Sequence, residues 1–487
     1  MFISFDKNKK EAIYKQIAHN ITDKILSAEF SYNMKLPSIR ELSDSLKLSH
    51  MTIVKAYKLL EKDNLIKKIP GKGVFVNYNN IYSDCNKEIL SSWYSSIEDY
   101  QPRGLTLNLL KNTLIKKKYN LSYSMLSTSM AIDIKDLFLD ILNNQPEAIM
   151  SYSETSGDLS LKNSFIQYLA KFRSINTNIK NMIIVSGTQQ GLNLIASTFT
   201  SSKDLVIIES PSYTGAIDAF KNSGAIIKTL PIYNNTLSFN DLIIQCDKQP
   251  PKFIYLTPNY SNPTGYCLSQ KERIELLNLA EAFDFYIIED DPWGELSLEV
   301  NPPLPIKSYD KNNRVIYIKG ISKLLGAGYR VATLLAPNNI IKTIEKAKAR
   351  ADLGTALLSQ RLVSEILKSP LIDNHIKNIK EFIKKRVQLT VQIFKNNLST
   401  KVQYNIPKGG FNIWLTLPEE INTANLLFEY TYNEGITFLP GAICYPLHPQ
   451  HNEIRISIAF LNDKDYESAI TKLCELINKR LKLETRF

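Results

Sequence analysis

The chain has few cysteines and lacks a long apolar run. Its five cysteines are scattered, odd in number and without metal-ligand spacing, which argues against a disulfide framework and against a zinc site. They are Cys85, Cys246, Cys267, Cys444 and Cys474. No stretch approaches the roughly 18 consecutive apolar residues of a membrane helix, and charges occupy the N-terminal positions where a signal peptide is apolar. We therefore expect a cytoplasmic protein that contacts no membrane and holds no metal.

The length and the charge distribution indicate a multidomain protein. A chain of 487 residues, 44% of them hydrophobic, is too long for a single core and has enough apolar material for two or three domains. Residues 1–80 contain 14 Lys and Arg against 8 Asp and Glu, so +6 of the net charge of +11 lies in this short part. This excess hints at a polyanionic partner, although a solvated lysine-rich surface would give the same count.

Three helices are predicted near the N-terminus. The first has an apolar stripe at helical spacing, formed by Tyr14, Ile17, Ile21 and Ile25. Ser38 and Glu41 form a capping box that begins the second helix, and Ser49 is a good N-cap for the third. Two helices joined by so short a turn are typical of a helix-turn-helix.

The third helix has the character of a recognition helix followed by a wing. Its buried stripe is predicted to be Ile53, Ala56, Tyr57 and Leu60, which leaves His50, Thr52, Lys55 and Lys58 on the outer face. Residues 65–69 and 74–76 are predicted to form a β-hairpin around the cationic turn Pro70-Gly71-Lys72-Gly73.

The order of these pieces resembles the GntR type of winged-helix DNA-binding domain. The matching residues are Leu36-Pro37-Ser38, Arg40, Leu42, Ser49, Thr52, Ala56-Tyr57, Leu60, Gly71, Gly73 and Phe75. The resemblance implies double-stranded operator DNA as a partner. The DNA-binding residues that it implies are Ser38, Arg40, Ser49, His50, Thr52, Lys55 and Lys72. The family usually has Arg where this chain has His50.

We predict three parts: a winged helix-turn-helix domain at residues 1–78, a linker at 79–120, and a larger domain at 121–487. The linker is rich in Asn, Ser and Lys and contains one plausible helix, residues 89–97. In the larger domain, short β-rich runs at 182–185, 205–208, 253–256, 285–288 and 315–318 alternate with helical patterns. This alternation predicts an α/β fold around a mostly parallel sheet.

Polar clusters follow several of these strands, where open α/β sheets bind ligands. Ser186, Gly187 and Thr188 begin a helix and suit a phosphate. Three carboxylates, Glu289 to Asp291, end another strand, and residues 318–323 end a third with lysines. Taken singly, such groups are more often helix caps or solvated charges than catalytic groups.

Together, residues 145–480 resemble the fold-type I pyridoxal-phosphate enzymes, the aminotransferase superfamily. The resemblance implies a fold-type I domain with a smaller C-terminal α/β subdomain. It assigns the Schiff-base and catalytic role to Lys323 and the phosphate partner to Arg330. The resemblance also implies that Ser322 and the Ser186-Gly187-Thr188 turn bind the cofactor. Asp290 would pair with the pyridine nitrogen.

The same resemblance implies four further roles. Asn262 would bind the ring oxygen of the cofactor and Tyr213 would stack on its ring. Arg455 would bind an effector or substrate carboxylate. Tyr152 would reach the phosphate of a partner subunit, which implies a homodimer, and in the family the dimer is usually head-to-tail.

Three departures from the family pattern bear on chemistry. Trp293 replaces a tyrosine that donates to the ring oxygen, Gly320 replaces a serine that binds the phosphate, and Lys162 replaces an arginine. We expect pyridoxal-phosphate binding to survive these changes, whereas efficient transamination is less secure.

The fusion of the two modules resembles the MocR subgroup of GntR-type regulators. This resemblance implies a transcription regulator whose C-terminal domain senses an amino compound or pyridoxal phosphate itself. Two alternatives stay open. One is an active aminotransferase, with Lys323 as proton shuttle and Arg455 as carboxylate clamp. The other is a dimerisation scaffold without cofactor, against which the retained Lys323, Asp290, Asn262 and Arg330 argue.

Overall fold

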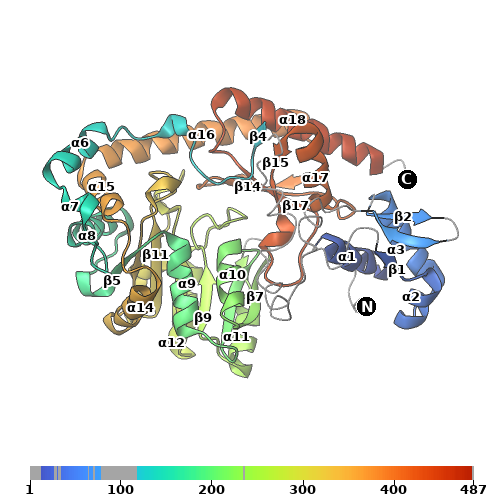
Figure 1. Ribbon diagram of the computed structural model, residues 1–487, viewed down its shortest axis with the longest axis horizontal. Helices are drawn as coiled ribbons and strands as arrows, with labels where there is room; N and C mark the ends of the chain where they lie inside the picture. Colours follow the sequence, from blue (N-terminus) through green and yellow to red (C-terminus); the bar gives the residue numbers. More distant parts are fainter. Residues whose placement is uncertain are drawn as a thin grey trace. The chain divides into compact units, whose positions relative to one another are not determined.

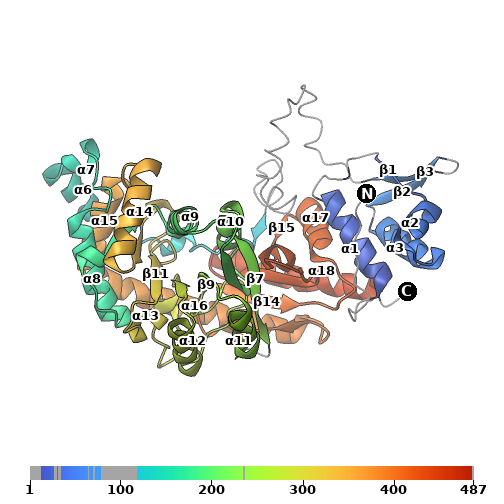
Figure 2. The same ribbon diagram turned by 90° about the horizontal axis from the view of Figure 1, so that it is seen from below.

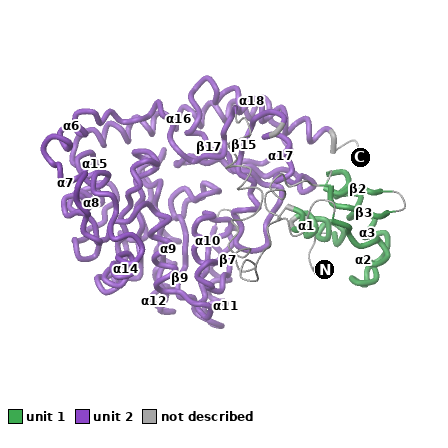
Figure 3. Tube along the Cα trace, viewed as in Figure 1, with its two compact units in different colours: residues 1–113 green, residues 114–487 purple. Residues whose placement is uncertain are grey.

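The computed structural model describes residues 12–26, 30, 34–63, 65–69, 72–77, 118–233 and 236–484. The chain divides into two compact units, residues 1–113 and 114–487 (Figure 3). The predicted helix at 89–97, the wing residues Pro70 and Gly71, and Cys85 lie outside the described residues. None of the described helices is long and apolar enough to cross a membrane.

The smaller unit is a three-helix domain with a small antiparallel sheet. Its helices are α1 (Ile13–Leu26), α2 (Ile39–Leu46) and α3 (His50–Lys62). The sheet has the order β1 (Lys35–Leu36), β3 (Gly73–Val76), β2 (Ile66–Ile69). The capping box of α2, the N-cap of α3 and the β2–β3 hairpin confirm the prediction. Strand β1 was not predicted, because two residues carry no periodic signal.

The buried stripes of the three helices meet in one core. The stripe predicted for α1 is confirmed at Ile17, Ile21 and Ile25, and the stripe of α3 is buried as predicted. Packing these apolar faces together stabilises the smaller unit, since burial contributes about 25 cal/mol per Å² of apolar surface. The polar face of α3 therefore remains at the surface.

The larger unit contains an eight-stranded sheet of order β5-β12-β11-β10-β9-β6-β7-β8. Strands β7, β6, β9, β10 and β11 run parallel, and β12 is antiparallel to both of its neighbours, as is β8 to β7. The bounds are β5 (Met182–Val185), β6 (Leu205–Ser210), β7 (Ile226–Tyr233), β8 (Thr236–Leu237), β9 (Phe253–Leu256), β10 (Tyr286–Asp290), β11 (Val315–Gly320) and β12 (Ala332–Leu335).

The mostly parallel sheet confirms the predicted fold, with two strands that extend further than predicted. Strand β10 begins at Tyr286 and continues to Asp290, and β11 continues to Gly320. The prediction ends these strands at Ile288 and Ile318 because polar residues follow there. Both extensions are held by parallel pairing, Asp290 being in register with Ile318.

Helices cover both faces of this sheet (Figures 1 and 2). On one face α9 (Thr188–Phe199), α10 (Thr214–Asn222) and α14 (Asn338–Ala351) pack on a core of aliphatic strand residues. On the other face lie α12 (Gln270–Ala282) and α13 (Ile306–Tyr309). Parallel sheets need this double cover because they are apolar on both sides.

A smaller antiparallel sheet follows in the same unit, in the order β13 (Gln403–Tyr404), β14 (Asn412–Thr416), β17 (Glu453–Ser457), β16 (Leu439–Pro440). The long helix α16 (Leu371–Asn397) runs from the larger sheet to this subdomain, which also contains α17 (Thr423–Glu434) and α18 (Asp463–Glu484) (Figure 1). Strand β4 (Tyr119–Asn120) pairs with β15 (Ile436–Thr437).

The remaining elements are α6 (Lys135–Asn144), α7 (Glu147–Met150), α8 (Leu159–Arg173), α11 (Phe239–Lys248), α15 (Leu357–Lys368) and the short 3-10 turns at Thr128–Met130, Ile179–Asn181, Gly294–Leu296, Ala327–Tyr329 and Gly441–Cys444.

Candidate functional site

Lys323 lies in the segment that follows β11, three residues beyond the end of the strand. Its Nζ atom donates to the carbonyl of Ser124 at 2.5 Å and lies 5.2 Å from the ring centroid of Trp293. Burial lowers the pKa of Lys323 to about 8, and the positive charge of Arg455 acts in the same direction. An amine with so low a pKa is partly unprotonated near neutral pH, which is the form that attacks a carbonyl carbon.

Asp290 ends the neighbouring strand, β10, and is buried. The hydroxyl of Tyr255, on β9, donates to its Oδ2 atom at 3.0 Å. Its Oδ1 atom is shielded from solvent and has no hydrogen-bond partner among the described residues. Burial raises the pKa of Asp290 to about 7. A buried carboxylate oxygen without a partner is costly, so this atom is suited to a cationic N–H group of a ligand.

Asn262, in the loop after β9, contacts Arg455, which lies in β17 of the smaller sheet. Arg455 Nη1 donates to Asn262 Oδ1 at 2.9 Å, and the Asn412 amide donates to the same oxygen at 3.3 Å. Its oxygen is occupied, and within the described part of the chain no hydrogen bond of its amide hydrogens is seen, so these could serve a ligand. The Nη2 atom of Arg455 donates to the Ser122 carbonyl, so the guanidinium is already partly engaged.

The start of α9 and the Arg330 side chain together form a cradle. Gly187 has φ +87°, and a Cβ atom there would lie 2.6 Å from Arg330 Nη2. Arg330 Nη2 donates to the Ser186 carbonyl at 3.1 Å, so the guanidinium lies against the first turn that also carries Thr188. A helix N-terminus beside an arginine favours an anion.

Tyr213, which is predicted to stack on the cofactor ring, contacts the helix that begins at this cradle. Tyr213 is the N-cap residue of α10, and its hydroxyl donates to Gln189 at 3.1 Å. Ser322 directly precedes Lys323 in the segment after β11. The structure therefore brings together, in one unit, ten of the predicted residues: Ser186, Gly187, Thr188, Tyr213, Asn262, Asp290, Ser322, Lys323, Arg330 and Arg455.

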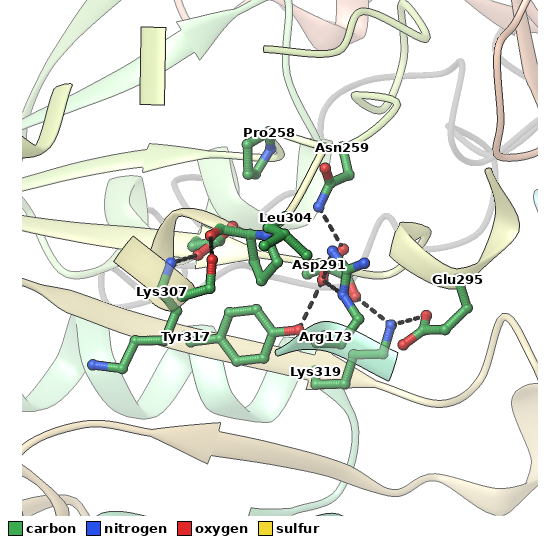
Figure 4. Close-up of polar contacts among 12 residues, drawn as sticks. Arg173, Pro258, Asn259, Asp291, Glu295, Leu304, Lys307, Tyr317 and Lys319 are labelled. Carbon is green, nitrogen blue, oxygen red and sulfur yellow. Dashed lines mark hydrogen bonds and ion pairs between the residues drawn. The ribbon is translucent and has the colours of Figure 1, made fainter. Parts of the chain in front are cut away.

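A buried charge network is centred on Asp291, the residue that follows the end of β10 (Figure 4). Asp291 accepts from Arg173 Nε at 2.8 Å and from the Tyr317 hydroxyl at 2.7 Å, and Lys319 pairs with Glu295. Burial alone would raise the pKa of Asp291, but the cations Arg173 and Lys319 hold it well below its usual range. Asp291 is thus a permanently charged anchor, whereas Asp290 is left for the site.

Trp293, which replaces the expected tyrosine, is fully buried. Its ring packs edge-on against Phe411 with centroids 4.9 Å apart. Its Nε1 atom has no acceptor among the described residues. The next residue must be glycine, because a Cβ atom at Gly294 would lie 2.1 Å from Arg173 Cζ.

Tyr152, a predicted site residue, and Lys162, one of the departures from the family pattern, make none of the contacts given above within the described residues. Tyr152 is 87% exposed, and none of the interactions found in the described part of the chain joins it to Lys323. Lys162, at the family's arginine position, is buried and donates to the Ser156 hydroxyl at 2.7 Å.

The predicted DNA-binding residues gather on the surface of α2, α3 and the wing. Arg40, His50, Lys55 and Lys72 are exposed. The hydroxyls of Ser38 and Ser49 accept from the backbone of Glu41 and Thr52 and so cap the helices. Their contribution to binding DNA would be through orientation of the first turns as much as through contact.

Sequence reasoning missed four residues of the cleft, Ser122, Ser124, Tyr255 and Asn412. Two of them act through the backbone carbonyl, which has no side-chain signature. The other two stand in strands whose apolar pattern conceals a single polar atom.

Both units match known families. Residues 13–76 match the bacterial regulatory proteins of the gntR family, and residues 116–473 match the aminotransferase class I and II family. The uncharacterized HTH-type transcriptional regulator YdfD of Bacillus subtilis is 30% identical over 481 residues, which are 97% of this chain and 98% of YdfD. The HTH-type transcriptional regulator NorG of Staphylococcus aureus is 26% identical, with 92% of this chain and 100% of NorG covered.

The larger unit also resembles a solved enzyme. The structure of LysN, the α-aminoadipate aminotransferase of Thermus thermophilus complexed with N-(5'-phosphopyridoxyl)-L-leucine, gives a TM-score of 0.74. Identity is 25%, over 81% of this chain and 100% of LysN. The chain belongs to the MocR subgroup of GntR-type regulators.

As a MocR-type regulator, the protein joins a DNA-binding unit to a pyridoxal-phosphate-binding unit. The cleft fits this cofactor on its own geometry. The partnerless Asp290 Oδ1 suits a ring N–H, the cradle at Gly187 and Arg330 suits a phosphate, and Lys323 lies in the same cleft. Bound pyridoxal phosphate supplies an aldehyde that bonds reversibly to amines and a ring that withdraws electrons.

Proposed function

We propose that the larger unit of this regulator is a sensor of a small amino compound or of pyridoxal phosphate, and that occupancy of the cleft changes the affinity of the smaller unit for operator DNA. The observation that supports the proposal is the set of residues around Lys323. Asp290 has a buried oxygen that is free among the described residues and Asn262 is held by Arg455, whereas Trp293 replaces the phenol expected to donate to the ring oxygen. The residues expected to bind the cofactor are retained, and the phenol expected to donate to its ring oxygen is replaced at position 293.

Each residue has a proposed role in holding the cofactor and the effector. Arg330 and the first turn of α9 hold the phosphate, Tyr213 covers the ring, and Asp290 keeps the ring nitrogen protonated. An amino compound competes with Lys323 for the aldehyde, and a carboxylate on that compound is held by Arg455. Because Arg455 already donates to Asn262 and Ser122, binding a carboxylate exchanges these contacts.

We further propose a homodimer in which Tyr152 of one subunit reaches the phosphate of the other. Supporting this, Tyr152 is highly exposed and Met150, two residues before it, is 85% exposed. Exposed apolar side chains close together mark contact surfaces. We place the protein in the cytoplasm, since that is where a bacterial regulator meets its operator.

An active aminotransferase is the second candidate, and one observation favours it. Lys323, Asp290, Arg455 and Arg330 are all positioned in one cleft, which is the set that a carboxylate-bearing amino substrate needs. The complete winged helix-turn-helix weighs against a purely metabolic role, because such an enzyme has no use for a DNA-binding unit.

The test is a titration of the full-length protein, loaded with pyridoxal phosphate, against its own upstream intergenic DNA at several salt concentrations. A panel of amino acids is added in parallel, and absorbance of the cofactor is recorded on the same samples. Specific DNA binding that shifts with one amine supports the sensor. Conversion of the cofactor to its aminated form without any specific DNA binding would instead establish the aminotransferase.

A further inference from the structure

Glu209 is a fully buried carboxyl group to which the proposed function gives no role. It stands in β6, one residue before the strand ends. Its Oε1 atom accepts from the Thr257 backbone N–H at 2.8 Å and from the Ser261 hydroxyl at 3.1 Å. Its Oε2 atom is shielded from solvent and has no hydrogen-bond partner among the described residues.

The two donors belong to the loop that presents Asn262 to the cleft. Thr257 follows β9, and Ser261 directly precedes Asn262. The loop closes on itself, since Ser261 N donates to the Tyr266 carbonyl at 2.6 Å. Glu209 therefore fixes the loop at both sides of the turn that leads into Asn262.

The charges that face Glu209 do not compensate a carboxylate. The titratable groups that act on it most strongly, or on which it acts strongly, are Asp290 of β10, Tyr255 of β9 and Tyr266 of the loop, and none of these three is a cation. Burial, with a smaller contribution from the charge of Asp290, raises the pKa of Glu209 to about 8. A buried neutral carboxyl costs much less than a buried unpaired carboxylate.

A second glutamate, which contacts the same loop through Tyr266, provides the contrast. Glu272, on α12, accepts from Leu237 N at 3.1 Å, from the Tyr266 hydroxyl and from Ser269 in a capping box. Burial raises its pKa, but these hydrogen bonds outweigh burial and lower the pKa below the usual value. Glu272 is therefore held as a carboxylate, with its oxygens satisfied.

We propose that Glu209 is a positioning residue that carries a proton in the native protein, and that its neutral carboxyl fixes the Asn262 loop without placing a second negative charge beside Asp290. The inference rests on the proposed cofactor role of Asn262, but not on effector sensing or DNA binding. A neutral isostere should therefore replace Glu209, and only removal of the acceptor should loosen the loop.

The experiment compares Glu209→Gln, Glu209→Ala and the matched control Glu272→Gln in the full-length protein. Thermal unfolding of the cofactor-free protein and the dissociation constant for pyridoxal phosphate are measured from about pH 5 to about pH 9. We expect Glu209→Gln to keep the wild-type dissociation constant within about twofold, Glu209→Ala to raise it about tenfold, and Glu272→Gln to lower Tm by roughly 2–4 °C or more.

The pH dependence of Tm tests whether Glu209 carries a proton. A residue that only fills space would give a Tm difference that does not change with pH. With a folded-state pKa of about 8 against an ordinary value of 4.5, the folded protein binds an extra proton between these values. The contribution of Glu209 to the free energy of unfolding of the wild type therefore falls as the pH rises from about 4.5 to about 8. Glutamine does not titrate, so the Tm of Glu209→Gln minus that of the wild type should rise up to about pH 8 and then level off.

Two results would overturn the inference. A loss of stability in Glu209→Gln as large as in Glu272→Gln, with a constant Tm difference across the pH range, would mean that Glu209 is ionised. A folded Glu209→Ala variant with wild-type cofactor affinity would mean that it does not position Asn262. Neither result depends on an effector or on DNA, so the two outcomes are distinct from a failure of the sensor proposal.

Discussion

The Oγ1 atom of Thr188 lies 2.6 Å from the position that a Cβ atom on Gly320 would occupy. Thr188 begins α9, and Gly320 ends β11 beside the phosphate cradle. The hydroxyl missing at Gly320 is thus matched by a hydroxyl from the facing element, and a serine at 320 cannot fit while Thr188 keeps its position. The two positions form an interdependent pair.

Because the two positions are interdependent, substitutions at both should have non-additive effects on pyridoxal-phosphate affinity. Gly320→Ser alone should weaken pyridoxal-phosphate binding about tenfold, equivalent to about 1.4 kcal/mol, because the new Cβ atom displaces Thr188. Thr188→Ala alone should weaken it by a similar factor through loss of a phosphate hydroxyl. The combined variant should bind better than either, as followed by absorbance titration. Additive losses would show that the two positions do not share one role.

The lowered pKa of Lys323 predicts the pH dependence of cofactor capture. The unprotonated amine is the reactive form, so the rate at which the cofactor-free protein takes up pyridoxal phosphate should rise with pH and level off above about pH 8. An unperturbed lysine would keep rising to about pH 10.4. Stopped-flow absorbance measures the midpoint.

Lys323→Ala is the control for this profile. It should abolish the absorbance of the covalently held cofactor while circular dichroism remains that of the wild type. An unaltered cofactor spectrum in a folded Lys323→Ala variant would show that Lys323 does not bond to the cofactor.

Local chemistry explains which parts of the structure could be predicted from the sequence. The capping box of Ser38 and Glu41 spans three residues, and the polar residues at strand ends follow apolar runs directly, so both leave a local pattern. Asp290 and Lys323 could be placed at one edge of the sheet because parallel strands bring their carboxyl ends together, whereas Asn262 was assigned by the resemblance to the fold-type I enzymes.

The contacts that escaped prediction join distant parts of the chain. The Lys323 contact with the Ser124 carbonyl spans 199 residues, and the Arg173–Asp291 pair spans 118. No periodicity links such positions, and a buried arginine in an amphipathic helix looks like any surface cation until its partner is known. The need for glycine at position 294 follows only from the structure, in which the Arg173 side chain packs against it.

Replacing Trp293 with the tyrosine that the family usually has should increase the rate of cofactor conversion. Trp293→Tyr should restore a hydroxyl that donates to the ring oxygen of the cofactor, and so assist proton transfer by Lys323. The rate of cofactor conversion by an amino acid should rise about tenfold, since a hydrogen bond worth about 1.4 kcal/mol in the transition state changes a rate by that factor. Trp293→Phe, which fills the same core without a hydroxyl, is the matched control. Single-turnover absorbance distinguishes them, and equal rates in the two variants would mean that the missing phenol does not limit proton transfer.

Arg40 predicts the salt dependence of operator binding. It is exposed on α2, next to the residues that begin the helix-turn-helix, and a phosphate contact from it would release one counterion. Arg40→Ala should weaken operator binding and reduce the slope of log K against log salt by about 0.9. Lys135→Ala, an exposed cation on α6 of the other unit, should leave both unchanged. Fluorescence anisotropy over a series of salt concentrations measures both quantities. If affinity falls while the slope stays at the wild-type value, Arg40 contacts a base or supports the helix and does not neutralise a phosphate.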